Sequence, residues 1–173
     1  DKVSKFCSLY TRTSAEPLKR LENAKDSRFC ENVKMYSGGG GLISSMHDYL
    51  VFLEMIRRGG QYNNARVLGR KTVELMLRNH LPGDMASMGQ PTFSEMPMAG
   101  IGFGLGGAIL LDPAKAQILG SEGEFTWGGM ASTAFWIDPM EEITVVFMTQ
   151  LIPSSSYPIR RELRVLVYQA LID

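Results

Sequence analysis

The sequence predicts an α+β fold, with helices and loops in residues 1–100 and antiparallel strands followed by a C-terminal helix in residues 101–173. Two observations support this division. Apolar residues recur at helical spacing before residue 100, whereas apolar runs separated by turn residues follow it. The length of 173 residues, with 45% hydrophobic and 21% charged residues, also fits one ordinary domain. We therefore expect one domain, with an antiparallel sheet of about three strands and a packed terminal helix.

The charges of the chain balance. Eighteen Lys and Arg residues accompany eighteen Asp and Glu residues, so the formal net charge is zero. This balance lacks the basic surface that binds nucleic acids or anionic membranes, and we expect neither as a partner. The sequence contains no signal-peptide core and no run of eighteen apolar residues. It leaves the compartment open, with a slight preference for the cytoplasm.

Cysteine and histidine usage argues against a metal site. Cys7 and Cys30 can form one disulfide or remain apart, and we expect free thiols because a chain of this size does not need a cross-link. His47 and His80 lie 33 residues apart, without acidic residues at ligand spacing. We therefore expect no metal ion and no cofactor.

Capping motifs and periodicity predict two helices in the first part of the chain. Ser45-Met-His-Asp48 has the S-x-x-D form of a capping box, and an apolar stripe runs from it to Gly59-Gly60, a natural stop. A second, shorter helix surrounds Val73 and ends before Pro82-Gly83. The stripe of the first helix consists of Met46, Tyr49, Leu50, Leu53 and Ile56.

The other segments of this part are less regular. Residues 1–12 have the spacing of a short helix, and residues 13–31 are polar enough for a surface connection. Residues 83–100 form a Met-rich loop over a core or a cleft. Because methionine fills irregular gaps well, we expect these side chains to serve mainly as core filler.

Strand-like segments begin at Ile101. Residues 102–111 have the pattern of one strand, and residues 117–120 supply a partner across the Asp112-Pro113 turn. Gly102, Gly104 and Gly107 formally match G-x-G-x-x-G. The nearby turn leaves no room for the helix that this nucleotide-binding motif requires, so we interpret the glycines as bulges or close backbone approaches.

A hairpin and a helix complete the predicted fold. Residues 131–137 and 143–150 flank a turn, and the second strand, which runs from Ile143 to Gln150, has apolar residues on both faces, as is typical of an internal strand. Pro158 begins a helix whose apolar stripe packs on the sheet. The stripe consists of Ile159, Leu163, Leu166, Val167, Ala170 and Leu171, while Arg160, Arg161, Glu162 and Arg164 face water.

The order of these motifs resembles the C-terminal part of the β-lactamase-like serine hydrolases. The chain is most similar to their esterase branch, which is related to class C β-lactamases and D-alanyl-D-alanine peptidases. This resemblance covers nearly the whole chain and implies a single, partial domain of the β-lactamase-like fold. The matching segments are residues 37–45, Asp48-Tyr49, residues 67–68, 71–76 and 102–106, Trp127-Gly-Gly129, Phe135-Trp-Ile-Asp-Pro139 and residues 145–149.

The resemblance implies acyl-transfer chemistry. In the family, a serine of an S-x-x-K motif attacks an ester or lactam carbonyl, and the lysine shares the proton with a tyrosine of Y-x-N or Y-x-S. A third motif, often Trp-Gly-Gly in esterases, lines the opposite wall. By position it is Trp127, Gly128 and Gly129 here, and the N–H of Met130 corresponds to an oxyanion donor. Trp127 either lines the cleft or covers only the core, and both interpretations stay open.

The first two motifs are missing. No serine of the chain has a lysine three residues later, and no tyrosine supplies Y-x-N or Y-x-S in the expected context; Tyr62-Asn-Asn is not such a site. Ser132 stands where the esterases commonly have glycine and has no His or Lys nearby, so we interpret it as a hydrogen-bonded serine. His47 and His80 are interpreted as solvated residues at helix ends. We assign no catalytic residue to this chain and predict that it is inactive alone.

Two functional hypotheses follow. In the first, the chain is the C-terminal portion of a serine hydrolase for a small ester or lactam, active only when an N-terminal portion supplies nucleophile and base. A lysine that would pair with a substrate carboxylate is absent from Trp-Gly-Gly, which favours esters. In the second, it is a non-catalytic binding or assembly module. In the family an N-terminal strand covers residues 143–150, so we expect the isolated chain to self-associate through this strand.

Overall fold

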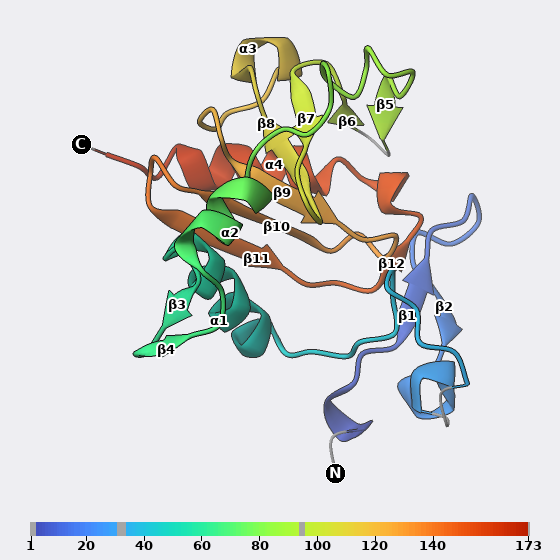
Figure 1. The fold of residues 1–173 in the computed structure, drawn as a ribbon. Helices are drawn as coiled ribbons and strands as arrows, with labels where there is room; N and C mark the ends of the chain where they lie inside the picture. The colour runs from blue at the N-terminus through green and yellow to red at the C-terminus, as the bar shows by residue number, and fades with distance from the viewer. Residues whose placement is uncertain (1–2, 31–33, 94–95, 173) are drawn as a thin grey trace.

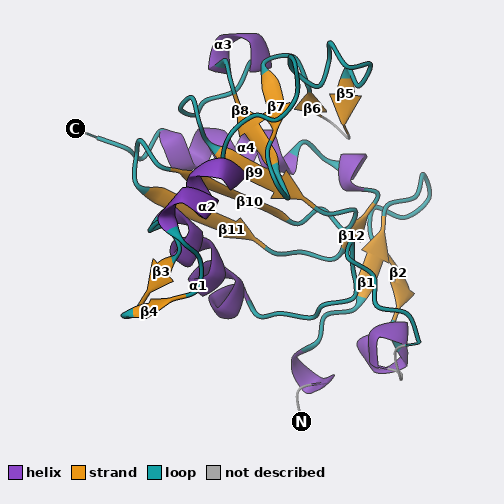
Figure 2. Cartoon of the chain, in the orientation of Figure 1, coloured by secondary structure: helices purple, strands orange, loops and turns teal. Residues whose placement is uncertain are grey.

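A five-stranded antiparallel sheet forms the centre of the protein, in the order β11-β10-β9-β8-β7 (Figure 1). The computed structural model describes residues 3–30, 34–93 and 96–172. Helices pack around this sheet (Figure 2), which confirms the predicted α+β class. The strands of the sheet are β7 (Ile101–Phe103), β8 (Ala108–Leu110), β9 (Phe125–Gly128), β10 (Ala134–Asp138) and β11 (Ile143–Phe147).

Shorter elements surround the central sheet. A three-stranded sheet has the order β12-β1-β2, and β3-β4 and β5-β6 form two small hairpins. The additional strands are β1 (Leu9–Thr11), β2 (Lys19–Glu22), β3 (Gln61–Tyr62), β4 (Ala65–Arg66), β5 (Thr92–Phe93), β6 (Met96–Pro97) and β12 (Leu151–Ile152). The α-helices are α1 (Met46–Arg57), α2 (Arg70–Met76), α3 (Pro113–Ala116) and α4 (Ile159–Tyr168), and the 3₁₀ helices are η1 (Val3–Lys5), η2 (Ala24–Asp26), η3 (Arg28–Cys30) and η4 (Ser154–Ser156).

The central strand β10 connects the two faces of the sheet, and all five of its residues are buried. Phe135 and Ile137 belong to the core that includes Ile56 of α1. Trp136, on the other face, lies under α4, with the Arg164 guanidinium 4.7 Å from its ring centroid. Because successive side chains of a strand point in opposite directions, α1 and α4 cover opposite faces of the sheet.

Helix α1 begins and ends where the sequence predicts. The Ser45 hydroxyl accepts a hydrogen bond from the Asp48 N–H at 3.1 Å, which confirms Ser45 as the N-cap. The Asp48 carboxylate accepts from the Ser45 hydroxyl at 2.7 Å, so the second bond of a capping box, to the Ser45 N–H, is replaced by this contact. Gly59 and Gly60 follow the helix with φ values of 66° and 93°, in the left-handed region that favours glycine. A Cβ at Gly60 would lie 2.2 Å from the Leu68 carbonyl oxygen, which also requires glycine there. Helix α2 confirms the second predicted helix.

The prediction of a helix in residues 1–12 is wrong for the residues that the structure describes. Only the short η1 is helical, and β1 follows it, pairing in parallel with β12 and antiparallel with β2. The Thr11 hydroxyl donates to the carbonyl of Ile152, 141 residues along the chain, at 2.7 Å. Local periodicity cannot reveal a strand partner at that distance, because strand formation depends on tertiary context. The predicted surface connection contains β2.

The central sheet has five strands rather than about three. The predicted strand of residues 102–111 is the hairpin of β7 and β8, which reverses where the Gly104 N–H donates to the Gly107 carbonyl at 2.8 Å. A Cβ at Gly104 would lie 2.3 Å from the Met76 carbonyl oxygen, and one at Gly107 2.5 Å from the Phe125 ring. This confirms close backbone approach at these glycines. Residues 117–120 are not a strand, since Gln117 ends α3 with a φ of 55°, and β9 pairs with β8 instead.

Strand β11 lies at the edge of the central sheet, so the prediction of an internal strand is wrong. Among the described residues, β10 is the only strand that pairs with it. Helix α1 explains one of its two apolar faces: Val146 packs against the core, and the Thr144 hydroxyl donates to the Glu54 carboxylate at 2.6 Å. The edge position agrees with the unpaired strand that the family resemblance implied.

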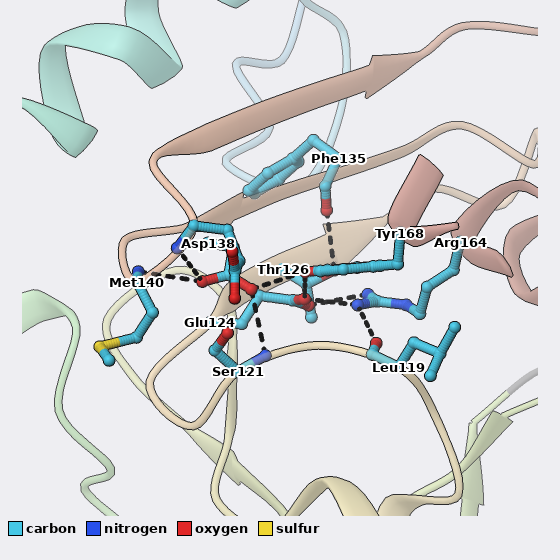
Figure 3. Close-up of polar contacts among 10 residues, drawn as sticks. Leu119, Ser121, Glu124, Thr126, Phe135, Asp138, Met140, Arg164 and Tyr168 are labelled. Carbon is cyan, nitrogen blue, oxygen red and sulfur yellow. Dashed lines mark hydrogen bonds and ion pairs between the residues drawn. The ribbon is translucent and has the colours of Figure 1, made fainter. Parts of the chain in front are cut away.

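The terminal helix α4 turns a polar stripe toward the sheet (Figure 3). Arg164 is only 4% exposed and forms a bidentate ion pair with Glu124, with 2.7 Å between Nη2 and Oε1. The Tyr168 hydroxyl lies 2.9 Å from the Glu124 carboxylate and 2.7 Å from that of Asp138. Arg161 and Glu162 are exposed as predicted, whereas the prediction that Arg164 faces water is wrong.

Two buried carboxylates of the sheet explain which face α4 presents. Glu124 and Asp138 are both fully buried, and buried carboxylates require charged or hydrogen-bonding partners. Arg164 and Tyr168 satisfy this requirement and thereby rotate Leu166, which the sequence places in the apolar stripe, to 58% exposure. The predicted packing of Leu166 on the sheet is therefore wrong, and Leu171 of the same predicted stripe is exposed as well.

Burial and hydrogen bonds together determine the protonation of this cluster. Burial alone would raise the pKa of Asp138, but bonds from the Tyr168 hydroxyl, the Ser121 N–H and two further backbone N–H groups hold the pKa below its ordinary value. Burial, reinforced by the neighbouring carboxylates, raises the pKa of Tyr168. Tyr168 therefore remains a neutral donor beside ionised Asp138.

We expect Arg164→Met to lower the free energy of unfolding by about 3–5 kcal/mol, because it leaves the Glu124 carboxylate buried without its cation. Urea unfolding monitored by circular dichroism measures this change. Arg161→Met is the matched control on the exposed side of α4, and it should stay within about 0.5 kcal/mol of the unmodified chain. Equal losses in the two variants would contradict the assigned role of the buried pair.

We expect Glu54 to stabilise the fold above about pH 4.5 and to lose this effect as the pH falls toward 2. Hydrogen bonds from Arg57, and also from Thr144 and Arg58, lower the pKa of Glu54 from 4.5 to about 2 against the opposing effect of burial. Because the pKa of Glu54 is lower in the folded chain, the unfolded chain binds the proton first as the pH decreases. The free energy of unfolding therefore decreases as the pH decreases through this range. In urea unfolding, Glu54→Gln should lower the free energy of unfolding most near neutral pH, and this loss should become smaller below pH 4.5. A pH-independent cost would contradict this linkage; the exposed Glu162→Gln is the control.

Candidate active-site wall

The Trp-Gly-Gly segment lies where the central sheet opens on one side. Strand β8 pairs with β9 no further than Thr126, whereas β10 continues along Trp127 and Gly128. Within residues 3–30, 34–93 and 96–172, no strand pairs with Trp127 or Gly128 on the β8 side. The backbone there can approach a ligand directly, as an active-site strand requires.

Aromatic and sulfur-containing side chains surround Trp127. Its ring stacks on Phe93, with centroids 5.2 Å and planes 25° apart, and meets the edge of Phe103 at 5.2 Å. It packs against the core around Ile56 and against a second apolar cluster that includes Ile101 and Leu110. It also lines a cleft of about 60 Å³ together with Met96 and Met98. Trp127 thus packs on the core and also borders this small cleft, while its contact with a substrate stays a prediction. Met98 is buried as core filler, as expected of the Met-rich loop.

A tight turn of residues 129–133 follows β9. The Gly129 N–H donates to the Thr133 carbonyl at 3.0 Å, and the Ser132 N–H donates to the Gly129 carbonyl at 3.1 Å. Met130 lies in this turn and is 76% exposed. Its N–H donates to no oxygen of the residues that the structure describes. This N–H is therefore available to a bound anion.

Helix α4 holds this turn through Arg160, a residue that the sequence predicted to face water. Arg160 Nη2 lies 2.9 Å from the Gly129 carbonyl oxygen and 3.1 Å from that of Thr133. The signal that could have revealed it is the spacing of Arg160, Arg164 and Tyr168, which places all three on one face of a helix. The same face binds the buried carboxylates.

Ser132 has a structural role in the turn. It is 3% exposed, and its hydroxyl donates to the Leu151 carbonyl at 2.7 Å, so its interpretation as a hydrogen-bonded serine is confirmed. Its φ of 68° lies in the left-handed region, which favours glycine. The hydroxyl is directed at a backbone acceptor rather than at a base.

The histidines and Tyr62 lie outside this wall. His47 is an exposed residue of the first turn of α1, and His80 Nε2 lies 2.8 Å from the Leu75 carbonyl oxygen at the end of α2. Tyr62 is followed by Asn63 and Asn64, whose φ values of 45° and 64° form the turn of the β3-β4 hairpin. The Tyr-Asn-Asn run is thus explained by turn chemistry.

The structure also bears on the thiols, on metal ligands and on membrane-spanning helices. Cys7 and Cys30 are free and exposed. The described part of the chain contains no group of three His, Cys, Asp or Glu residues that could hold a metal ion. In the same residues, every helix is too short or too polar to cross a membrane.

Comparison with known proteins identifies the family of this fold. The family model described as Beta-lactamase matches residues 8–169. The chain belongs to the β-lactamase family. This match includes the Trp-Gly-Gly strand, the turn that carries Met130 and the terminal helix, and it confirms the family resemblance of the sequence.

The β-lactamase-family relatives are longer than this chain. Protein Rv1367c of Mycobacterium tuberculosis (strain ATCC 25618 / H37Rv) is 33% identical over 124 residues, which are 69% of this chain and 30% of the relative. The solved structure of EstCE1, described as a hydrolase with promiscuous acyltransferase activity, is 27% identical, with a TM-score of 0.71. The similarity covers 93% of this chain and 43% of the EstCE1 chain. Simvastatin synthase (LovD6 mutant) from Aspergillus terreus, at 24% identity, shares the fold with a TM-score of 0.76, over 96% and 43% of the two chains.

Proposed function

We propose that this chain forms one wall of the active site of a serine hydrolase, and that residues outside this sequence supply the nucleophile and its base. The reaction is hydrolysis of an ester or lactam through an acyl-enzyme. One observation carries the proposal: Met130 is an exposed residue whose N–H has no partner among the described residues, and it directly follows Trp127-Gly-Gly129, where β9 has no strand on its β8 side within the described residues. A donor in this place suits the negative oxygen of a tetrahedral intermediate.

The surroundings of the wall favour a neutral substrate. Trp127, Phe93 and Met96 present an apolar surface beside the open backbone. A lysine in the position of Trp127 would attract a substrate carboxylate, and the aromatic ring instead favours an uncharged acyl or aryl group. Esters are therefore the preferred class, and the similarity to EstCE1 supports acyl-transfer chemistry.

The missing nucleophile is the reason for placing part of the site elsewhere. No serine in the sequence precedes a lysine at the S-x-x-K spacing, and the Ser132 hydroxyl is engaged by the Leu151 carbonyl. The chain spans 43% of the length of EstCE1. These facts support a division in which the described wall faces a nucleophile from another segment.

The isolated chain should hydrolyse neither a p-nitrophenyl ester nor a chromogenic cephalosporin, and a serine-reactive phosphonate should not label it. The reading frame upstream of Asp1 should encode S-x-x-K followed by Tyr-x-Asn or Tyr-x-Ser, and the longer protein should hydrolyse the ester. In that protein, Met130→Pro removes the backbone donor and should lower kcat by about 10²–10³-fold. Met130→Ala keeps the N–H and is the control. Stoichiometric labelling of Ser132, or equal kcat in the two variants, would contradict the proposal.

A second candidate is a non-catalytic assembly module, and the edge position of β11 favours it. An edge strand presents backbone N–H and carbonyl groups to another chain, and all five residues of β11 are only partly buried. We propose self-association along residues 143–150. Sedimentation velocity should show dimers that increase with concentration, and Val145→Lys should shift them toward monomer. A stable monomer at high concentration, with freely exchanging amides in residues 143–150, would eliminate this candidate.

A further inference from the structure

The Arg160 guanidinium contacts the same peptide group that carries the proposed oxyanion donor. Arg160 Nη2 donates to the Gly129 carbonyl oxygen at 2.9 Å, and this carbonyl shares its peptide bond with the Met130 N–H. Electron delocalisation across the peptide bond couples the two groups, so a hydrogen bond to the oxygen makes the N–H a stronger donor. The effect is largest when the bonding partner is charged, as a guanidinium always is in proteins.

We propose that Arg160 is a positioning residue of the oxyanion site, which polarises the Met130 N–H and fixes the turn of residues 129–133. Its second bond, to the Thr133 carbonyl at 3.1 Å, reaches the other end of the same turn. One guanidinium nitrogen thus holds both ends of the turn. The role in catalysis rests on the proposed function, whereas the polarisation of the N–H does not.

The glycines of Trp-Gly-Gly provide the space for this contact. A Cβ at Gly128 would lie 2.8 Å from Arg160 Nη2 and 2.9 Å from the Thr133 carbonyl oxygen, and a Cβ at Gly129 would lie 2.5 Å from the Thr133 hydroxyl. Real Cβ atoms essentially never approach other atoms so closely. Gly128 is therefore required by the close approach of the Thr133 carbonyl and of Arg160 from α4, independently of any substrate, whereas the Cβ contact at Gly129 is with a side chain of the turn itself.

The position of Arg160 is fixed by its own helix. Arg164 and Tyr168 follow it at intervals of one turn and attach α4 to Glu124 and Asp138. This anchoring places Arg160, in the first turn of α4, beside Gly129. The charge reaches the turn from a rigid element rather than from a mobile loop.

Amide exchange of the ¹⁵N-labelled chain, measured by solvent-exchange NMR, tests the polarisation without any need for catalysis. Base-catalysed exchange removes the amide proton, so a more acidic N–H exchanges faster. Arg160→Met should therefore slow exchange of the Met130 N–H several-fold. The same substitution should quicken exchange of the Gly129 and Ser132 N–H groups, because the turn that protects them loosens. A purely structural role of Arg160 would not slow the exchange at Met130.

Arg161→Met is the matched control, since it removes an exposed positive charge from the next position of α4. It should leave all three exchange rates unchanged. Arg160→Gln retains a neutral donor and should slow exchange of the Met130 N–H less than Arg160→Met does. It also provides the comparison if Arg160→Met does not fold. A Met130 rate that is unchanged or increased in the Arg160 variants, relative to Arg161→Met, would overturn the proposal. Catalytic inactivity of the longer protein would instead contradict only the proposed function.

Discussion

The buried ion pair between Arg164 and Glu124, extended by Tyr168 and Asp138, determines how the rest of the structure is arranged. It attaches α4 to one face of the central sheet while the apolar side of α1 covers the other. Removing two carboxylates from water is unfavourable unless the geometry of their partners is good, so the cluster permits one rotation of α4 and disfavours the others. The exposure of Leu166 is a consequence of this electrostatic requirement.

The same rotation links the core to the candidate site. With Arg164 directed into the sheet, Arg160 reaches the turn that follows β9, and this turn carries Met130, whose N–H has no partner among the described residues. Trp127 belongs to both regions, since it packs against the core and lines the cleft. The wall is therefore built largely from backbone groups held by rigid elements, which suits a site that stabilises charge by preorganised dipoles.

Local chemistry in the sequence predicted the features whose causes are local. The N-cap of Ser45 and the glycines after α1 depend on neighbouring residues or on backbone conformation, and they were predicted correctly. The pairing of β1 with β12 and the burial of Arg164 depend on partners far along the chain. The motif order predicted Trp127 to Met130 as a wall, but Arg160 escaped prediction because an arginine on an amphipathic helix is normally solvated.

The parallel pairing of β1 with β12 has a consequence for how the chain folds. Tyr10 lies opposite Leu151, and the Thr11 hydroxyl bonds the Ile152 carbonyl across 141 residues. Closing a loop of that length costs more entropy than any hairpin of the central sheet, and few contacts accompany it in these short strands. Such a long-range pairing raises the contact order of the fold and slows its formation. The central sheet is therefore expected to assemble first, with the three-stranded sheet closing last and opening most readily in native-state fluctuations.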